Sequence, residues 1–87
     1  MKIIAKPKTL SEFLFLELML LHLNCNGFLN GVVIGGVDVT NYVKGNIENG
    51  LSIFENSYNS YDFILDISLD KQEFQNEKNK MLKLLLN

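Results

Sequence analysis

The sequence predicts an α+β domain in which two helices cover one face of an antiparallel sheet of three to five strands. Three observations lead to this prediction: a leucine-rich helical run early in the chain, two β-rich runs joined by two glycines, and an alternating run followed by an amphipathic helix. Hairpin-linked strands flanked by helices favour an antiparallel sheet. The 87 residues suffice for one domain, residues 1–87, with one core.

The first predicted strand is the short apolar run at residues 2–6. It is followed directly by Pro7, the only proline of the chain. Proline has no amide proton and cannot continue a central ladder, so this strand is expected at an edge or terminus of the sheet.

The first helix is predicted over residues 9–24. Thr9 and Glu12 have the spacing of a capping box, in which each side chain bonds the backbone amide of the other, and Gly27 favours termination. The helix is apolar around its whole circumference, so it has to be covered on more than one side. The sheet and the last helix are expected to cover two sides, and a second chain would be needed for any remainder.

Residues 28–43 are predicted to be β structure. The runs Val32–Ile34 and Val37–Val39 are separated by Gly35 and Gly36 alone. Two glycines between β-branched runs are typical of a two-residue hairpin turn.

Residues 40–58 support two interpretations. Apolar residues recur at helical spacing, but the segment also contains two glycines and several asparagines, which disfavour a helix. We therefore favour, by a small margin, a turn at Gly45–Asn46 or Asn49–Gly50 followed by a strand over Leu51–Glu55. The helical alternative stays open.

The clearest strand is residues 61–69, where apolar and polar side chains alternate. Asp70 and Glu73 then form a second capping box, which begins an amphipathic last helix. The apolar stripe expected to pack inward comprises Phe74, Met81, Leu82, Leu84 and Leu85.

Catalytic and cofactor signatures are weak. His22 and Cys25 form the one potential metal pair, but zinc needs three or four ligands and the sequence has no second histidine or cysteine. The glycines of residues 31–36 match no nucleotide-binding motif. We therefore expect no enzyme activity, cofactor or metal; a metal- or thiol-dependent enzyme at His22 and Cys25 is the most distant of the alternatives.

Charge is distributed unevenly along the chain. Residues 9–70 carry eight carboxylates and one lysine, whereas three lysines precede them and the last helix is also net basic. The net charge is −2 and there is no arginine, so nucleic-acid binding is disfavoured. The sheet region is thus expected to present an acidic surface.

These features favour a non-enzymatic interaction protein, such as an inhibitor or immunity-type antitoxin that occludes a basic partner, for example a nuclease toxin. The alternative is the structural subunit of a homo-oligomer, for example a homodimer, that associates through the helix at 9–24. The residues predicted to bind the basic partner are Asp38, Tyr42, Glu55, Tyr58, Asp62 and Asp66.

The expected compartment is the cytoplasm. A single cysteine, Cys25, excludes an intrachain disulfide, and small secreted domains usually carry several. No apolar run approaches the roughly 20 residues needed to cross a bilayer, so no membrane association is expected.

Overall fold

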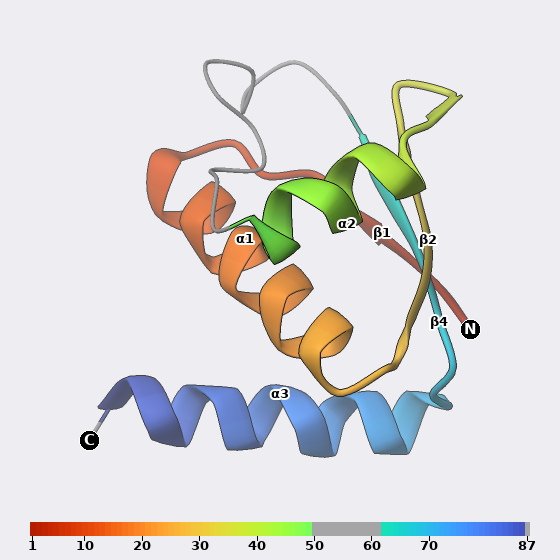
Figure 1. Ribbon diagram of the computed structural model, residues 1–87. Coiled ribbons are helices and arrows are strands. Elements are labelled where there is room, and N and C mark those ends of the chain that lie inside the picture. Colours follow the sequence, from red (N-terminus) through yellow and green to blue (C-terminus); the bar gives the residue numbers. More distant parts are fainter. Residues whose placement is uncertain (50–61, 87) are drawn as a thin grey trace.

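The computed structural model describes residues 1–49 and 62–86 and has a sheet layered against helices (Figure 1). The described chain forms the strands β1 (Lys2–Ala5), β2 (Leu29–Ile34), β3 (Val37–Asp38) and β4 (Phe63–Ile67), and the helices α1 (Leu10–Cys25), α2 (Thr40–Glu48) and α3 (Lys71–Leu86). The predicted α+β class and the antiparallel sheet are confirmed.

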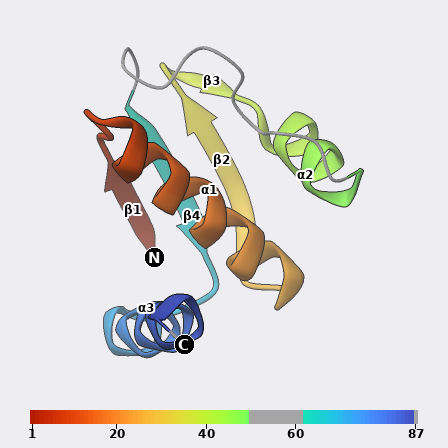
Figure 2. The ribbon, with the colours of Figure 1, turned by 90° about the vertical axis from the view of Figure 1, so that its left-hand side faces the viewer.

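The strands lie in the order β1-β4-β2-β3, and every neighbouring pair is antiparallel. Leu65 of β4 is paired with Ile3 on one side and Val32 on the other, so β4 is a central strand. β1 lies at the edge, as the following Pro7 predicts. Figure 2 shows α1 lying across this sheet.

The β2–β3 connection is the predicted two-residue hairpin turn. Ile34 pairs with Val37, and the intervening Gly35 and Gly36 have φ of 57° and 82°. Positive φ at both central residues matches the twist of the flanking strands and favours glycine at both.

α1 begins at a partly confirmed capping box. The Glu12 amide donates to Thr9 Oγ1 at 3.1 Å, as expected. The Glu12 carboxylate, however, accepts from the amide of Lys8 at 3.3 Å rather than from that of Thr9. The helix ends at Cys25, one residue beyond the predicted end, and Gly27, which follows with a φ of 76°, favours termination as expected.

The core lies between α1 and the sheet. One stripe of α1 is buried there, and the rings of Phe13 and Phe63 lie 6.4 Å apart between their centroids. The most deeply buried side chains are Leu20, Leu23, Val32, Val43, Phe63, Leu65 and Ile67.

α3 crosses one end of this layer, on the side of the sheet that carries α1 (Figure 1). Its capping box is complete: the Glu73 amide donates to Asp70 Oδ1 at 2.8 Å, and the Asp70 amide donates to Glu73 Oε1 at 3.1 Å. Met81 is buried as predicted, but Leu84 and Leu85 are exposed. They lie in the last turns, which project beyond α1, so nothing in the described chain covers them.

The preference for a turn at Gly45–Asn46 is wrong, because both residues lie inside α2. Val43 and Ile47, one turn apart, are buried against the core. Burying two such side chains gains more than the cost of about 1 kcal/mol for one helical glycine. The β interpretation of residues 40–43 is wrong for the same reason. The strand predicted over Leu51–Glu55 lies outside the described residues.

Candidate functional site

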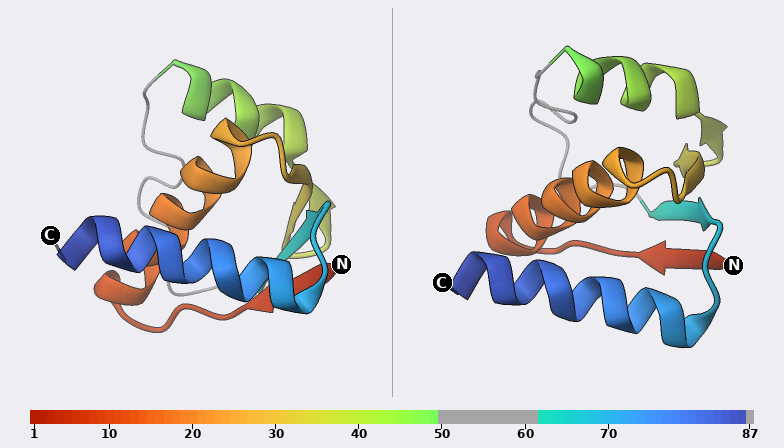
Figure 3. Two further views of the ribbon diagram at one scale, coloured as in Figure 1. Left: turned by 90° about the horizontal axis from the view of Figure 1, so that it is seen from below. Right: turned by 60° about the horizontal axis from the view of Figure 1, so that its bottom comes forward.

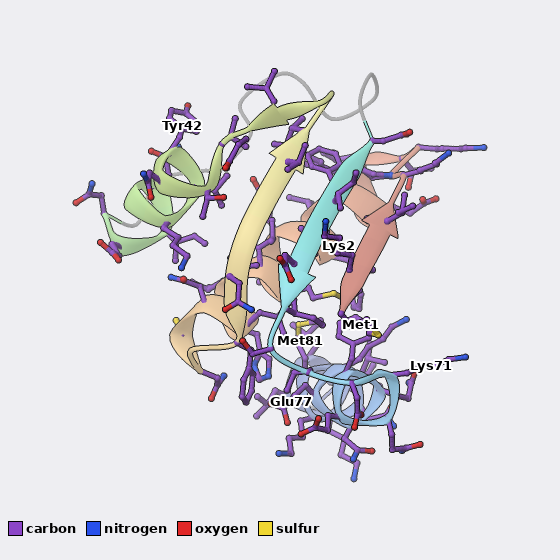
Figure 4. All side chains as sticks on the ribbon, turned by 90° about the vertical axis from the view of Figure 1, so that its right-hand side faces the viewer. Met1, Lys2, Tyr42, Lys71, Glu77 and Met81 are labelled. Carbon is purple, nitrogen blue, oxygen red and sulfur yellow. The ribbon has the colours of Figure 1, made fainter. Side chains whose placement is uncertain are left out.

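Figure 4 looks onto the face of the sheet that is turned away from α1. Within β4 the buried Phe63, Leu65 and Ile67 face α1, so Ile64 and Asp66 point toward this open face. The strand registers then place two rows of side chains across it. One row comprises Ile4, Ile64, Val33 and Asp38, and the next comprises Lys2, Asp66 and Gly31.

A hollow of about 320 Å³ opens on this face around Gly31. Gly31 is paired with Asp66 of β4, and a Cβ on it would lie 3.6 Å from the Asp66 Cβ and 3.5 Å from Thr40 Oγ1. The absence of a side chain at this outward position therefore leaves room between the two polar groups. The carboxylates of Asp38 and Asp66 both border the hollow.

Asp38 is held in place by Thr40. Thr40 Oγ1 donates to Asp38 Oδ1 at 2.6 Å, and the Thr40 amide donates to the same oxygen at 3.0 Å. These two hydrogen bonds, the hydroxyl first, lower the pKa of Asp38 below the usual aspartate value. The Thr40 hydroxyl also accepts from the Val32 amide at 3.0 Å, which fixes the start of α2 against β2.

Tyr42 extends this polar surface onto α2. Tyr42 is 65% exposed and projects from α2 (Figure 4). It lines a second shallow hollow, which Asn30 and Asp38 also border. Three of the predicted partner-binding residues, Asp38, Tyr42 and Asp66, thus border two hollows that share Asp38, Asn30 and Thr40. Glu55 and Tyr58 lie outside the described residues.

Two lysines of the N-terminal segment lie beside two of the predicted carboxylates. Lys2 is the cross-strand partner of Asp66, and Lys6 Nζ lies 3.6 Å from Asp62 Oδ2. The Lys6–Asp62 pair is well exposed, so its attraction is weak. The charge of the open face is therefore mixed rather than uniformly acidic.

The sequence contained signals for several of these neighbours. If Ile3 and Ala5 of the predicted strand point inward, Lys2 and Ile4 must point outward. The pairing of this strand with β4, however, is a long-range contact that periodicity does not reveal. The role of Thr40 follows once a helix is known to start there, because an aspartate two residues earlier can bond the first amide of a helix.

α1 carries a second candidate surface on the side facing solvent (Figure 2). The buried stripe of the helix accounts for only part of its apolar residues, as its all-round apolar sequence predicts. Four leucines of the opposite stripe are between 40% and 55% exposed. They are Leu10, Leu14, Leu18 and Leu21, and Cys25 continues the stripe to the end of the helix.

His22 and Cys25 have different surroundings. His22 Nε2 lies 3.1 Å from Glu77 Oε1 in a partly buried contact with α3, whereas Cys25 is exposed. Across residues 1–49 and 62–86, no cluster of three or more histidine, cysteine or acidic side chains could hold a metal ion.

None of the helices described is long and apolar enough to cross a membrane. No protein-family model, curated protein or solved structure matches this chain. The candidate sites therefore rest on their geometry and chemistry.

Proposed function

We propose that the protein is a non-catalytic interaction module that associates with a second copy of itself through the outer stripe of α1. The observation that supports this proposal is the run of four partly exposed leucines, Leu10, Leu14, Leu18 and Leu21, on one side of one helix. Single exposed leucines are ordinary on protein surfaces, whereas a contiguous apolar patch is typical of an interaction site.

The spacing of the stripe supports a copy of the chain as the partner. Leu14, Leu18, Leu21 and Cys25 follow one another at intervals of four, three and four residues, which is the spacing of the contact seam between paired helices. The interior of the stripe is apolar, and Glu17, three residues after Leu14 and four before Leu21, lies at its border. In a two-fold dimer the same patch of both subunits forms the interface, so this stripe would pack against the same stripe of the second copy.

The magnitude of the burial predicts a weak dimer. Four leucines that are about half exposed correspond to about 3–6 kcal/mol of burial per copy, at about 1.5–3 kcal/mol for a whole leucine side chain. Two copies double this gain, but association costs about 4–15 kcal/mol in lost freedom of motion. We therefore expect a dissociation constant in the micromolar range or weaker.

Analytical ultracentrifugation across a concentration series tests this proposal. The unmodified protein should change from monomer to dimer, and Leu14→Glu or Leu21→Glu should remain monomeric because each places a charge in the seam. Val37→Glu is the matched control, since Val37 is 61% exposed on β3, away from α1. A protein that stays monomeric throughout the series, or a dimer that Val37→Glu weakens as much as Leu14→Glu does, would contradict the proposal.

A second candidate is the inhibitor or immunity-type function, with a basic protein bound at the open face of the sheet. It is favoured by the hollow at Gly31, which two carboxylates, those of Asp38 and Asp66, border together with a single lysine, Lys2. Any partner should bind less tightly at high salt and after Asp66→Lys, with Glu48→Lys as the control on α2. Binding that is insensitive to both salt and Asp66→Lys would rule out this mode.

The cytoplasm is the compartment that we propose. A single exposed cysteine, Cys25, supports a reducing environment, because an accessible thiol would otherwise tend to pair with another. The protein isolated from its source should then carry a free thiol at Cys25, as measured by alkylation before and after reduction.

A further inference from the structure

A crevice of about 480 Å³ opens between β1, the first half of α1 and the first half of α3. Figure 3 shows these three elements side by side at one border of the molecule. The crevice is separate from both the outer stripe of α1 and the open face of the sheet. Its apolar lining comprises Ile3, Ala5, Pro7, Phe15, Leu16, Met19, Leu65 and Phe74.

The lining belongs to the core rather than to the surface. Leu16, Met19 and Leu65 are buried, and Phe15 and Phe74 pack against the core from either side. The crevice therefore leads from solvent to the interior through a gap that α1 and α3 do not close. Its volume lies within the range of about 300–1,000 Å³ that is usual for small-molecule sites, which are mostly apolar with a few polar groups.

Lys78 gives the mouth of the crevice its chemistry. Its side chain is half-buried on α3, one turn after Phe74, and no hydrogen bond or ion pair joins it to another described residue. Lys6 also borders the crevice but already lies 3.6 Å from Asp62. The one carboxylate at the border, Glu12, comes from the first turn of α1 and accepts a hydrogen bond from the Lys8 amide.

We infer that the crevice binds a single-chain amphiphile with a carboxylate head, such as a free medium-chain fatty acid. The hydrocarbon chain lies against Met19 and Phe15, and the carboxylate pairs with the Lys78 ammonium. A half-buried lysine stem beside apolar walls suits this arrangement, because the stem adds to the apolar surface while the ammonium stays at the mouth. A cationic head is disfavoured because the Lys78 ammonium at the mouth would repel it.

The test compares three probes that share one tail, each kept below its micelle concentration: decanoate, decyl maltoside and decyltrimethylammonium. Binding is measured by calorimetry, and the site is located from methyl signals in a ¹H–¹³C spectrum. Decanoate should bind most tightly and should shift the methyl signals of Ile3 and Met19. It should leave the methyl signals of Leu14 and Leu21 unchanged, because these lie on the outer stripe of α1.

Two variants separate the charge from the crevice. Lys78→Gln should weaken decanoate binding about three- to fivefold, the range of a partly exposed ion pair, and should leave decyl maltoside binding unchanged. Lys83→Gln is the control, because this exposed lysine lies on the same helix and does not border the crevice. Ala5→Phe should fill the crevice and weaken the binding of all three probes. If Ala5→Phe does not fold, Lys78→Gln serves as the test, because Lys78 lies outside the core.

Several outcomes would overturn the inference. They are the absence of saturable decanoate binding, equal affinity for all three heads, equal effects of Lys78→Gln and Lys83→Gln, and shifts confined to Leu14 and Leu21. Vesicles of anionic phospholipid provide the last comparison. Binding to vesicles without binding to monomeric decanoate would indicate a membrane surface as the ligand and would also overturn the inference.

Discussion

His22 of α1 and Glu77 of α3 meet in a contact of 3.1 Å between Nε2 and Oε1, and this contact joins the two helices. Lys80 Nζ lies 2.9 Å from the other oxygen of Glu77. The Glu77 side chain is only 13% exposed, and each of its two carboxylate oxygens has a partner. Lys80 first, and then His22, lower the pKa of Glu77 below the usual glutamate value.

The lowered pKa of Glu77 predicts a specific loss of stability in acid. The contribution of ionised Glu77 to the free energy of unfolding is fully present above about pH 4.3, the usual pKa of glutamate in an unfolded chain. It is lost as the pH falls through the lower pKa of the folded protein. Between pH 5 and pH 2, the free energy of unfolding should therefore fall less steeply in Glu77→Gln than in the unmodified protein.

Denaturant unfolding at a series of pH values measures this difference. Glu48→Gln is the control, because Glu48 is exposed at the end of α2 and no contact with another described residue holds it. It should keep the acid dependence of the unmodified protein. The prediction would be contradicted if the free energy of unfolding fell equally steeply below pH 5 in Glu77→Gln and Glu48→Gln.

The capping box of α3 should contribute measurably to stability. Asp70→Ala removes the acceptor of the Glu73 amide, and loss of such a cap costs about 1 kcal/mol. Asn76→Ala, on the exposed surface of the same helix, should change stability by less than about 0.5 kcal/mol. Thermal unfolding of the two variants measures the comparison, and equal melting temperatures would show that the cap is dispensable.

Two leucines of α1 should respond to truncation with losses of stability of very different size. Leu20 is fully buried, so Leu20→Ala should cost about 2–5 kcal/mol through the lost burial and the cavity. Leu14 is 48% exposed, so Leu14→Ala should cost well under half as much in the monomer. Urea unfolding at low protein concentration measures both, and similar losses would show that the Leu14 side chain is covered in solution.

Alanine should have opposite effects at two glycines. Gly36 has a φ of 82° in the hairpin turn, and Gly36→Ala should destabilise the fold by about 1–2 kcal/mol because side chains disfavour that conformation. Gly45 lies inside α2 with no atom within 4 Å of an added Cβ, and Gly45→Ala should stabilise by about 0.5–1 kcal/mol. A loss at Gly45 would contradict the helical assignment of residues 40–48.

Local signals predicted most of the fold. The Asp70 and Glu73 capping box, the Gly35–Gly36 turn and the alternation in β4 each depend on neighbours within a few residues, and each was confirmed. For α2 the sequence left the helical alternative open and slightly favoured a turn and strand, because the local signals conflict. Its glycine and asparagines disfavour a helix, and only the burial of Val43 and Ile47 decides the competition.

The candidate sites were less predictable than the fold. The sequence indicated that α1 is apolar on more sides than the sheet alone can cover, and the leucines on its outer side are exposed. It also indicated an acidic middle segment, but it did not reveal that the N-terminal segment brings Lys2 to Asp66 and Lys6 to Asp62. The crevice beside Lys78 was not foreseen, because its walls come from three segments far apart in the chain.

The sequence by itself determined the elements whose stabilising contacts are local: the caps, the glycine turn, the alternating strand and the apolar helix. Only the tertiary structure decided which charges are neighbours, which leucines stay in solvent and where the core is left open. The physical reason is distance along the chain. Pairing Lys2 with Asp66, or Phe15 with Phe74 around one crevice, depends on strand order and helix packing, which no short window of sequence encodes.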